Sequence, residues 1–305
     1  MRVLQLINNL NREGAQIMVS NLVTTGCSEQ VKYVVCVRQP GSALARTLRE
    51  SGVCVIEPDH YYGFRHLQKS VEYLENTIIN NNIDLIHAHM ADAAFLGWIV
   101  ARRFKIPLVI SHHGDDILMK CGLLCRSIYY VLLNLASRFA LMNIAVSASV
   151  ADRVHKLLFI NRKNIQIIHN GVVIPEKSLF TGKGNKFDLL KNNLTLINIG
   201  RLVPLKGQRQ LILAVARLID QFPDVRLYIV GGGQMEQELK SLASSLNAES
   251  NIEFPGITEN VPTYLKKADI YVSSSRTEGL PVSVLEAMAW NIPVIASDIP
   301  GNRNI

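Results

Sequence analysis

The sequence alternates short apolar runs with longer amphipathic stretches along almost its whole length. The runs are rich in Val, Ile and Leu and are bounded by Gly, Pro and Asn, which is typical of strands buried on both faces of a parallel sheet. In the stretches between them, apolar residues recur with the helical period of about 3.6 residues, as in helices that pack one face against such a sheet. In the first half of the chain we predict strands over 2–7, 31–37, 53–57, 83–89, 107–113, 142–147 and 165–171. We predict helices between them, over 14–26, 42–51, 65–81, 92–104, 117–140 and 148–158.

The same alternation starts again after a polar connector, residues 175–193, which is rich in Lys, Asn and Gly. The predicted strands are then 194–202, 225–233, 251–256, 269–275 and 293–297, with helices over 207–221, 234–247, 260–267 and 281–290. Two such series joined by a linker predict an α/β protein of two doubly wound, Rossmann-like domains, 1–175 and 176–305. Ligands of these sheets bind beyond the carboxyl ends of the strands, so we expect the domains to face each other across a cleft.

Length and cysteine content fit this interpretation. A chain of 305 residues, 48% of them hydrophobic, can bury a core in each of two domains. The five cysteines are odd in number and lack the spacing of metal ligands. Cys121 and Cys125 could share a helix face, but buried, reduced thiols are the more common outcome and indicate a reducing compartment.

Neither a signal peptide nor a transmembrane helix is predicted. The chain begins with the strand-like run MRVLQLI, without a charged leader or a cleavage site, so we expect a cytoplasmic protein. The most lipophilic region, residues 123–147, is interrupted by Arg126, Asn134, Arg138 and Asn143. It therefore predicts a buried or interfacial helix followed by a strand, since a membrane span needs about twenty apolar residues.

The positive charge is concentrated in the first domain. Residues 1–175 hold 18 Lys and Arg against 12 Asp and Glu, a net charge of +6, whereas the remainder holds 14 against 13, a net charge of +1. This excess is either a solvated basic surface or a surface that attracts anionic lipid headgroups or a phosphate-bearing acceptor, on the inner face of the plasma membrane. Nucleic acid is disfavoured, because the chain has no dense run of Lys and Arg and no aromatic-basic repeat.

The segment 274-SSRTEGLPVSVLEAMA-289 carries the strongest signal. Glu278 follows a predicted strand, and Glu286 lies on the helix that Pro281 is expected to begin, since proline suits a first helical turn. The backbone amides of Gly279 and Leu280 would point out of the helix N-terminus, where an anion is favoured. Because carboxylates bind hydroxyl pairs, the two glutamates could hold two sugars with a phosphate between them. A carboxylate on a helix is otherwise most often simply solvated.

Two further strand ends in the second domain carry candidate residues. Arg201 and Lys206, in 200-GRLVPLKG-207, could bind a diphosphate, or could belong to a solvated loop. In the glycine turn that follows the next strand, Gly231 and Gly233 could let the backbone approach a ligand. Glu236 occupies the third glycine position of the dinucleotide fingerprint, and the chain has no P-loop motif, so neither type of nucleotide site is supported.

The first domain has weaker candidates. Gly14, at the start of a predicted helix, could let a phosphate approach. The histidines of 87-HAH-89 and 112-HHGDD-116 lie at the ends of separate predicted strands, with no zinc-like spacing, so we expect no metal and favour a substrate contact for His113. The segment 169-HNG-171, which includes Asn170 and Gly171, is predicted to end the last strand of the domain, close to any cleft.

With these residues the chain resembles the retaining glycosyltransferases of family 4, which have the GT-B fold. The resemblance runs from residue 1 to about residue 305. It is carried by Gly14, 113-HG-114, Ser147, 170-NGV-172, 200-GRL with Lys206 and Gly207, 231-GGG-233, 278-EGLPVSVLE-286 and 287-AMAWNIPVIAS-297. It implies transfer of a sugar, of hexosyl type, from a nucleotide diphosphate with retention at the anomeric carbon.

The resemblance also implies a role for each residue. Arg201 and Lys206 would hold the donor diphosphate, and Glu286 would bind the nucleotide ribose. Glu278 and the segment of Gly279, Leu280 and Pro281 would hold the transferred sugar and its phosphate. His113 would contact that sugar, and the loop of Gly14 would approach the phosphates or the acceptor. No metal or cofactor is implied, because the cations and the helix terminus neutralise the leaving diphosphate.

The sequence departs from the family pattern in two places. The first loop has one glycine, Gly14, where relatives often have two. The chain stops at 298-DIPGNRNI-305, where family members continue through further sheet and helices, so we expect a truncated second domain with apolar surface exposed.

We therefore expect a transferase that acts on a surface polysaccharide, such as lipopolysaccharide, or on a lipid-linked oligosaccharide. The alternatives are an inactive, truncated pseudoenzyme and a sugar-nucleotide epimerase of related fold. A nicotinamide oxidoreductase is disfavoured, because no complete glycine fingerprint is present.

Overall fold

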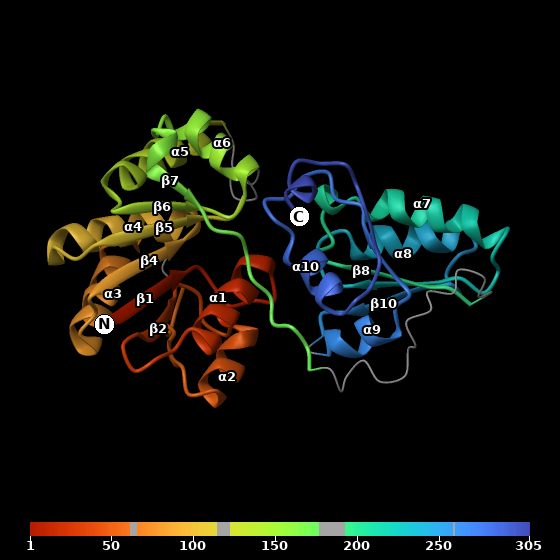
Figure 1. The fold of residues 1–305 in the computed structure, drawn as a ribbon, viewed down its shortest axis with the longest axis horizontal. Helices are drawn as coiled ribbons and strands as arrows, with labels where there is room; N and C mark the ends of the chain where they lie inside the picture. Colours follow the sequence, from red (N-terminus) through yellow and green to blue (C-terminus); the bar gives the residue numbers. More distant parts are fainter. Residues whose placement is uncertain (62–65, 115–122, 177–192, 259) are drawn as a thin grey trace. The chain divides into compact units, whose positions relative to one another are not determined.

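The computed structural model describes residues 1–61, 66–114, 123–176, 193–258 and 260–305. These residues form two compact units, Met1–Gly171 and Val172–Arg303 (Figure 1). The first six residues of the helix predicted over 117–140, the thiol of Cys121 and most of the polar connector lie outside the described ranges, and the side chain of Cys125 is likewise not described. Across these ranges we find no helix with both the length and the hydropathy that a bilayer crossing requires.

The first unit is built on a seven-stranded, all-parallel sheet with the strand order β3-β2-β1-β4-β5-β6-β7. Its strands are β1 Arg2–Ile7, β2 Lys32–Val37, β3 Cys54–Ile56, β4 Leu85–His89, β5 Leu108–His112, β6 Met142–Ala145 and β7 Ile165–Ile167. The strand order reverses between β1 and β4, which is the switch point at which doubly wound sheets bind ligands.

In the described ranges of this unit, the helices between the strands are α1 Gly14–Thr25, α2 Ala43–Glu50, α3 Leu67–Asn81, α4 Met90–Phe104, α5 Leu123–Phe139 and α6 Ala148–Leu158. Helix α1 contacts α2, and α3, α4, α5 and α6 contact one another in succession. Right-handed crossovers place these two groups on opposite faces of the sheet. Helices α3 and α4 are followed by the C-cap residues Asn82 and Lys105, both in the left-handed conformation that closes a helix.

The second unit repeats this plan with a five-stranded parallel sheet of order β10-β9-β8-β11-β12. Its strands are β8 Thr195–Ile199, β9 Arg226–Val230, β10 Ile252–Gly256, β11 Ile270–Ser273 and β12 Val294–Ala296. Its helices are α7 Gln208–Ile219, α8 Glu236–Ser245, α9 Val261–Lys267 and α10 Val282–Ala289. The two units are thus Rossmann-like α/β folds, as predicted, and here the strand order reverses between β8 and β11.

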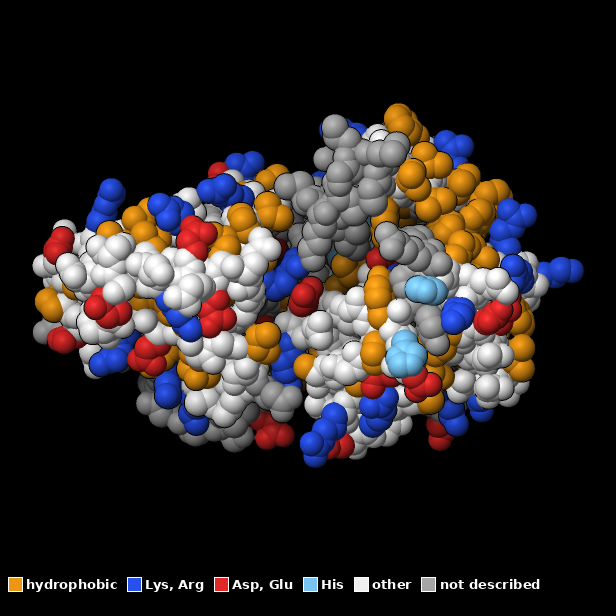
Figure 2. Space-filling view, turned by 180° about the vertical axis from the view of Figure 1, so that it is seen from behind, with side chains coloured by type: hydrophobic (Ala, Val, Ile, Leu, Met, Phe, Trp, Pro, Cys, Tyr) orange, Lys and Arg blue, Asp and Glu red, His pale blue; other side chains and the backbone are white. Residues whose placement is uncertain are grey.

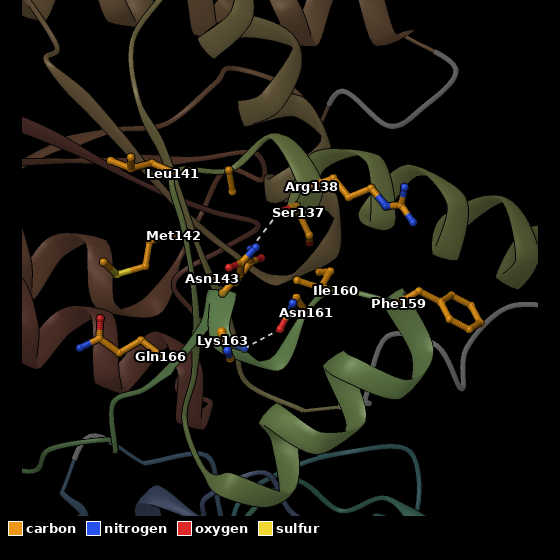
Figure 3. A pocket seen from close by; sticks show the side chains of 12 residues that line it. Ser137, Arg138, Leu141, Met142, Asn143, Phe159, Ile160, Asn161, Lys163 and Gln166 are labelled. Atoms are coloured by element: carbon orange, nitrogen blue, oxygen red, sulfur yellow. Dashed lines mark hydrogen bonds between the residues drawn. The ribbon is translucent and has the colours of Figure 1, made fainter.

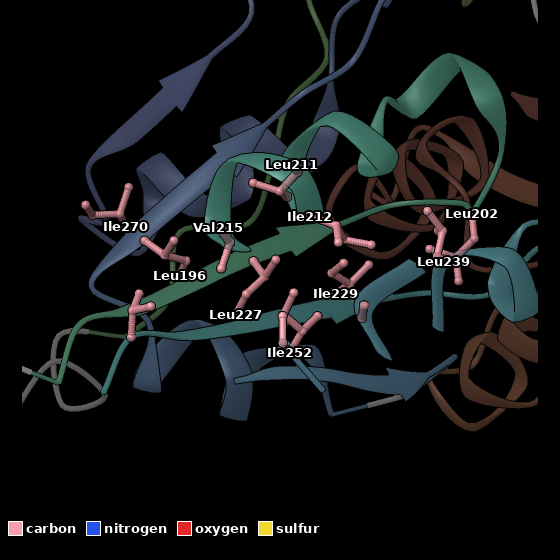
Figure 4. Packing of buried hydrophobic residues seen from close by; sticks show 13 residues of the cluster. Leu196, Leu202, Leu211, Ile212, Val215, Leu227, Ile229, Leu239, Ile252 and Ile270 are labelled. Carbon is pink, nitrogen blue, oxygen red and sulfur yellow. The ribbon is translucent and has the colours of Figure 1, made fainter. Parts of the chain in front are cut away.

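Alternating residues of β8 fill two cores on the two faces of this sheet. Leu196 packs with Leu211 and Ile212 of α7, in the cluster drawn in Figure 4. Ile197, the next residue, packs with Val284 and Ala287 of α10 on the other face. Both faces of the strand are therefore buried, which explains why its sequence reads as a continuous apolar run.

Two predictions about these elements were wrong. The last strand of the first unit ends at Ile167, so the segment 169-HNG-171 follows the strand instead of ending it. Cys36 is buried, and burial raises the pKa of its thiol to about 11. Cys27 and Cys54, however, are exposed, because they lie at the end of a helix and on an edge strand.

Candidate functional site

The predicted residues of the second unit leave the carboxyl ends of β8 and β11, which are neighbours at the switch point. Arg201 and Lys206 lie in the loop after β8, and Lys206 closes the short 3-10 helix Pro204–Lys206. Glu278 lies in the loop that joins β11 to α10. The parallel sheet therefore brings two loops that are far apart in the sequence to one edge.

Lys206 and Glu278 are in direct contact. The Nζ of Lys206 donates to the Oε1 of Glu278 over 2.6 Å, and the two side chains are 21% and 12% exposed. Ser275 donates to the same carboxylate oxygen, also over 2.6 Å. The Oγ of Ser274 donates to the backbone oxygen of Lys206 over 2.9 Å. The cation and the carboxylate are thus held in place by the end of β11.

Three glycines allow this close packing. A Cβ on Gly207, whose φ is +66°, would lie 2.1 Å from the backbone oxygen of Ser274. A Cβ on Gly231 or Gly233 would lie 2.0 Å or 2.4 Å from the oxygens of Gly200 and Leu202 respectively. In this structure the close neighbours of these glycines are the backbone of the chain itself. The glycine turn after β9 therefore supports the loop that carries Arg201 and Lys206.

Helix α10 carries the second predicted carboxylate. The helix begins at Val282, and the buried Pro281 is its N-cap residue rather than its first helical residue, because Pro281 keeps an extended backbone with ψ of 110°. Gly279 and Leu280 precede it, and Leu280 is buried in the unit. Glu286 is half-buried, a little more than one turn into the helix. The predicted order of loop carboxylate, helix N-terminus and helical carboxylate is therefore present along one segment.

Tyr271 connects these parts, and sequence reasoning missed it. Its buried hydroxyl donates to the backbone oxygen of Ile199 over 3.2 Å and lies 2.8 Å from the Oγ of Ser283. Burial raises the pKa of Tyr271, and the nearby carboxylates of Glu278 and Glu286 raise it further. The side chain thus links the end of β8 to the first turn of α10, between the two glutamates. As a tyrosine inside an apolar strand it gave no signal of this role.

In the first unit, His113 follows β5 and belongs to a network of one buried and two half-buried histidines. Its Nε2 lies 3.1 Å from the Nδ1 of His89, whose Nε2 lies 2.7 Å from the Oε1 of Gln5. The Nε2 of His87 lies 2.8 Å from the Oγ of Ser111. Burial lowers the pKa of His113 to about 3 and that of His87 to about 4, and it also lowers the pKa of His89. All three rings are therefore neutral near pH 7.

A second polar cluster, also missed by sequence reasoning, lies where β1 and β4 separate. The buried Arg38 donates to the Oδ1 of Asn8 over 2.9 Å and lies 3.4 Å from Asp92. Asn8 donates in turn to Asp92 over 2.9 Å, and the hydroxyl of Tyr129 donates to the same carboxylate. Burial raises the pKa of Asp92, and Arg38 and Asn8 oppose that shift. The cluster explains how an ion pair can stay inside this unit.

The remaining predicted site residues belong neither to the Lys206–Glu278 contact nor to the two polar clusters of the first unit. Gly14 is the exposed first residue of α1, and Asn170 and Gly171 lie beyond β7 at the boundary between the units. Among the described residues, no three His, Cys, Asp or Glu side chains group closely enough to hold a metal ion.

A surface hollow of about 580 Å³ lies elsewhere in the first unit (Figure 3). It is lined by Ser137, Arg138, Ala140, Leu141, Met142, Asn143, Phe159, Ile160, Asn161, Lys163, Asn164 and Gln166. These residues surround the amino ends of β6 and β7, whereas His113 follows the carboxyl end of β5. The hollow is therefore at the opposite edge of the sheet from the predicted site residues.

Comparison with known proteins identifies both halves of the chain. The profile described as "Glycosyltransferase Family 4" matches residues 3–174, and the profile described as "Glycosyl transferases group 1" matches residues 183–305. A UDP-Gal:alpha-D-GlcNAc-diphosphoundecaprenol alpha-1,3-galactosyltransferase of Escherichia coli is 27% identical over 243 residues, which cover 77% of this chain and 63% of the relative. An uncharacterized glycosyltransferase of Methanocaldococcus jannaschii is 38% identical over 111 residues, 36% of this chain and 27% of the relative. The matched regions thus span less than two thirds of the length of these relatives.

Solved structures agree on the fold. The crystal structure of Anabaena Alr3699/HepE in complex with UDP-glucose superposes with a TM-score of 0.82 at 24% identity, over 99% of this chain and 82% of that one. This likeness establishes the GT-B type of fold for the described units.

Proposed function

The chain belongs to glycosyltransferase family 4, whose profile matches residues 3–174, and we propose that it transfers a sugar from a nucleotide diphosphate to a glycan or lipid-linked acceptor. The observation that carries the proposal is the contact between Lys206 and Glu278 at the switch point of the second sheet. A cation beside a carboxylate suits a ligand in which a phosphate adjoins a sugar with free hydroxyls.

We assign the donor to the residues around this contact. Lys206 and Arg201 neutralise the diphosphate, and the amides of Gly279 and Leu280 before α10 add hydrogen-bond donors. Lys206 and Ser275 both donate to Oε1 of Glu278, so the sugar hydroxyls bind at its other oxygen, Oε2. Glu286 takes the ribose hydroxyls. UDP-sugars are the first donors to test, because the Escherichia coli relative is named for UDP-Gal and the Anabaena structure holds UDP-glucose.

The proposed reaction retains the configuration of the anomeric carbon. The bond from that carbon to the leaving phosphate oxygen breaks, and a bond to the acceptor oxygen forms on the same face. The acceptor hydroxyl proton passes to the leaving phosphate oxygen, so the chain needs no general base. His113 contacts the transferred sugar. We expect the reaction to need no metal, because the cations and the helix N-terminus stabilise the charge of the departing diphosphate.

The test compares two glutamates of the second unit. We expect Glu286→Ala to weaken UDP-sugar binding and transfer about 10- to 100-fold, the cost of hydrogen bonds to a charged group. Glu249→Ala, at an exposed position, serves as the matched control and should leave both unchanged. Binding is measured by thermal shift against UDP-, GDP- and ADP-sugars, and turnover by release of the nucleotide with and without a glycan acceptor. Equal binding and turnover in the two variants would refute the assigned role. Interconversion of the donor sugar without an acceptor would favour the epimerase alternative.

We propose peripheral contact with an anionic membrane through α5. Ile128, Val131, Leu135 and Phe139 share one face of this helix and are between 37% and 59% exposed. Arg102 lies over the ring of Phe139. Arg138 precedes Phe139 in the last turn of α5. Figure 2 shows hydrophobic side chains gathered at the upper right, in the unit that carries α5, with Lys and Arg among them. Apolar side chains with a basic rim suit the interface of an anionic bilayer.

This contact is tested with two matched substitutions. Val131 on α5 and Ile79 on α3 are 59% and 58% exposed, so each can be replaced by Asp without disturbing the core. We expect Val131→Asp to abolish sedimentation with phosphatidylglycerol vesicles and Ile79→Asp to leave it intact. Binding should also weaken with salt and with neutral phosphatidylcholine vesicles. If the wild-type chain fails to sediment with anionic vesicles, the proposed membrane contact is wrong.

A further inference from the structure

A chain of hydrogen bonds runs through three neighbouring strands and ends at His113. Gln5 lies in β1 and is 1% exposed, and His89 is the last residue of β4 and is fully buried. His113 directly follows β5 and is half-buried. The contacts are 2.7 Å from Gln5 Oε1 to His89 Nε2 and 3.1 Å from His89 Nδ1 to His113 Nε2. Because β1, β4 and β5 are adjacent and in parallel register, the sheet itself aligns these side chains.

The direction of these hydrogen bonds follows from the amide of Gln5. Its oxygen can only accept, so the Nε2 of His89 carries that ring's proton and its Nδ1 has the lone pair. The Nε2 of His113 must then donate to His89, which leaves the lone pair of His113 on Nδ1. A neutral imidazole has one proton, so one buried amide determines the tautomer of both rings.

We propose that Gln5 and His89 are positioning residues that hold His113 as its Nε2–H tautomer, so that Nδ1 is presented as a hydrogen-bond acceptor for a hydroxyl of the transferred sugar. This inference rests on the proposed function, because the sugar contact of His113 belongs to it. Gln5 and His89 touch no substrate themselves and act only through the ring of His113. The same network with the opposite polarity would make Nδ1 a donor, which would recognise an acceptor oxygen such as a phosphate instead.

The tautomer can be measured without any turnover. In a long-range proton–nitrogen correlation spectrum of the full chain labelled with ¹⁵N-histidine, protonated and unprotonated ring nitrogens have well-separated shifts. We expect His113 near pH 7.5 to have a protonated Nε2 and an unprotonated Nδ1, with its signals assigned by their loss in His113→Gln. A protonated Nδ1 in the wild-type chain would overturn the proposal, even if every variant of the network failed to fold.

A pair of substitutions tests the role of the amide. Gln5→Leu keeps the size of the side chain but removes the acceptor, so we expect the His113 signals to shift toward a mixture of tautomers. Gln16→Leu, which removes another buried glutamine of the same unit, should leave those signals unchanged. If Gln5→Leu folds and His113 keeps its wild-type shifts, the amide does not set the tautomer and the proposal is wrong.

Donor titration separates this inference from the proposed function. If both hold, UDP-sugar shifts the Nδ1 signal of His113, and Gln5→Leu lowers the turnover number about three- to ten-fold, the effect of one misdirected hydrogen bond. If the proposed function fails, no donor shifts the signal, yet the tautomer and its dependence on Gln5 still follow the expectation. If only the inference fails, the donor binds and is turned over, but Gln5→Leu changes neither the tautomer nor the turnover number.

Discussion

Lys206 and Glu278 form the pair of residues on which the proposed donor site depends. Glu278 is only 12% exposed, and a diphosphate placed beside its carboxylate would be repelled. Lys206, at 2.6 Å, offsets that charge before any ligand arrives. In the proposed site, the pair would therefore allow a carboxylate that binds sugar hydroxyls to lie next to a phosphate.

Lys206→Met should therefore weaken donor binding severely. Loss of the cation would remove the proposed phosphate contact and leave the carboxylate of Glu278 uncompensated, so we expect UDP and UDP-sugars to bind about 10- to 100-fold more weakly. Isothermal titration measures this loss. Lys240→Met is the matched control, since Lys240 forms an exposed pair with Glu236 over 2.7 Å on α8. Equal donor affinity in the two variants would show that Lys206 serves the fold alone.

Some of these residues could be predicted from the sequence, and others could not. Lys206 and Glu278 are charged residues directly after apolar runs, where a parallel sheet presents side chains to ligands. Gln5 and Tyr271 lie inside strands and resemble ordinary core residues, and the sequence marks His89 only as part of a histidine cluster. Their roles depend on partners in neighbouring strands, more than ten residues away, and no local pattern records which strands are neighbours.

At the scale of elements, the apolar runs predicted the strands, but the ends of the elements follow local chemistry. The strand predicted over 225–233 ends at Val230, because Gly231 adopts a φ of +138° that a continuing strand does not. The helix predicted over 207–221 begins at Gln208, because Gly207 adopts a left-handed conformation. A glycine in a sequence permits such turns, but its actual dihedral angles are set by the segments that pack against it.

Gly207→Ala should destabilise the second unit and loosen the loop that carries Lys206. The added Cβ would lie 2.1 Å from the backbone oxygen of Ser274, and Gly207 has a φ of +66°. The energetic costs of the steric clash and of the strained backbone therefore add together. We expect the free energy of unfolding to fall by at least about 2 kcal/mol and donor affinity to fall with it. Gly256→Ala is the control for conformation alone, since its φ is +75° and nothing lies within 4 Å of the added Cβ. Its cost should stay near 1 kcal/mol. Equal costs in urea denaturation would show that the contact with Ser274 relaxes freely.

At the scale of the whole molecule, two sheets of the same plan carry very different polar groups. All eight histidines of the chain lie in residues 60–169, within the first unit, whereas each unit holds one of the two tryptophans, Trp98 and Trp290. The pattern of strands and helices predicted two Rossmann-like folds, but the reversal of strand order at β1 and β8 has no local signature. Acid should therefore act on the two units differently, and each unit has its own fluorescent reporter.

Lowering the pH from 7.5 to 5.5 should destabilise the first unit selectively. His87, His89 and His113 have pKa values that burial lowers well below 6.5, so they stay neutral in the folded chain and bind protons only after unfolding. Burial also lowers the pKa of His112. The free energy of unfolding then falls as the pH drops below 6.5, by about 1.4 kcal/mol at pH 5.5 for each ring that stays neutral. The raised pKa of Asp92 acts in the opposite direction, but one carboxyl group does not cancel several rings.

Single-tryptophan variants make this measurable for each unit. Trp290→Phe leaves Trp98 to report the first unit, and Trp98→Phe leaves Trp290 to report the second. In urea titrations at pH 7.5 and 5.5 we expect the unfolding midpoint seen by Trp98 to fall markedly and that seen by Trp290 to change little, because residues 172–303 contain no histidine. Replacing His87 by Gln should reduce the pH dependence seen by Trp98, since one ring that resists protonation is removed. A midpoint that falls equally for both tryptophans would mean that the units unfold together, or that groups other than these histidines control stability in acid.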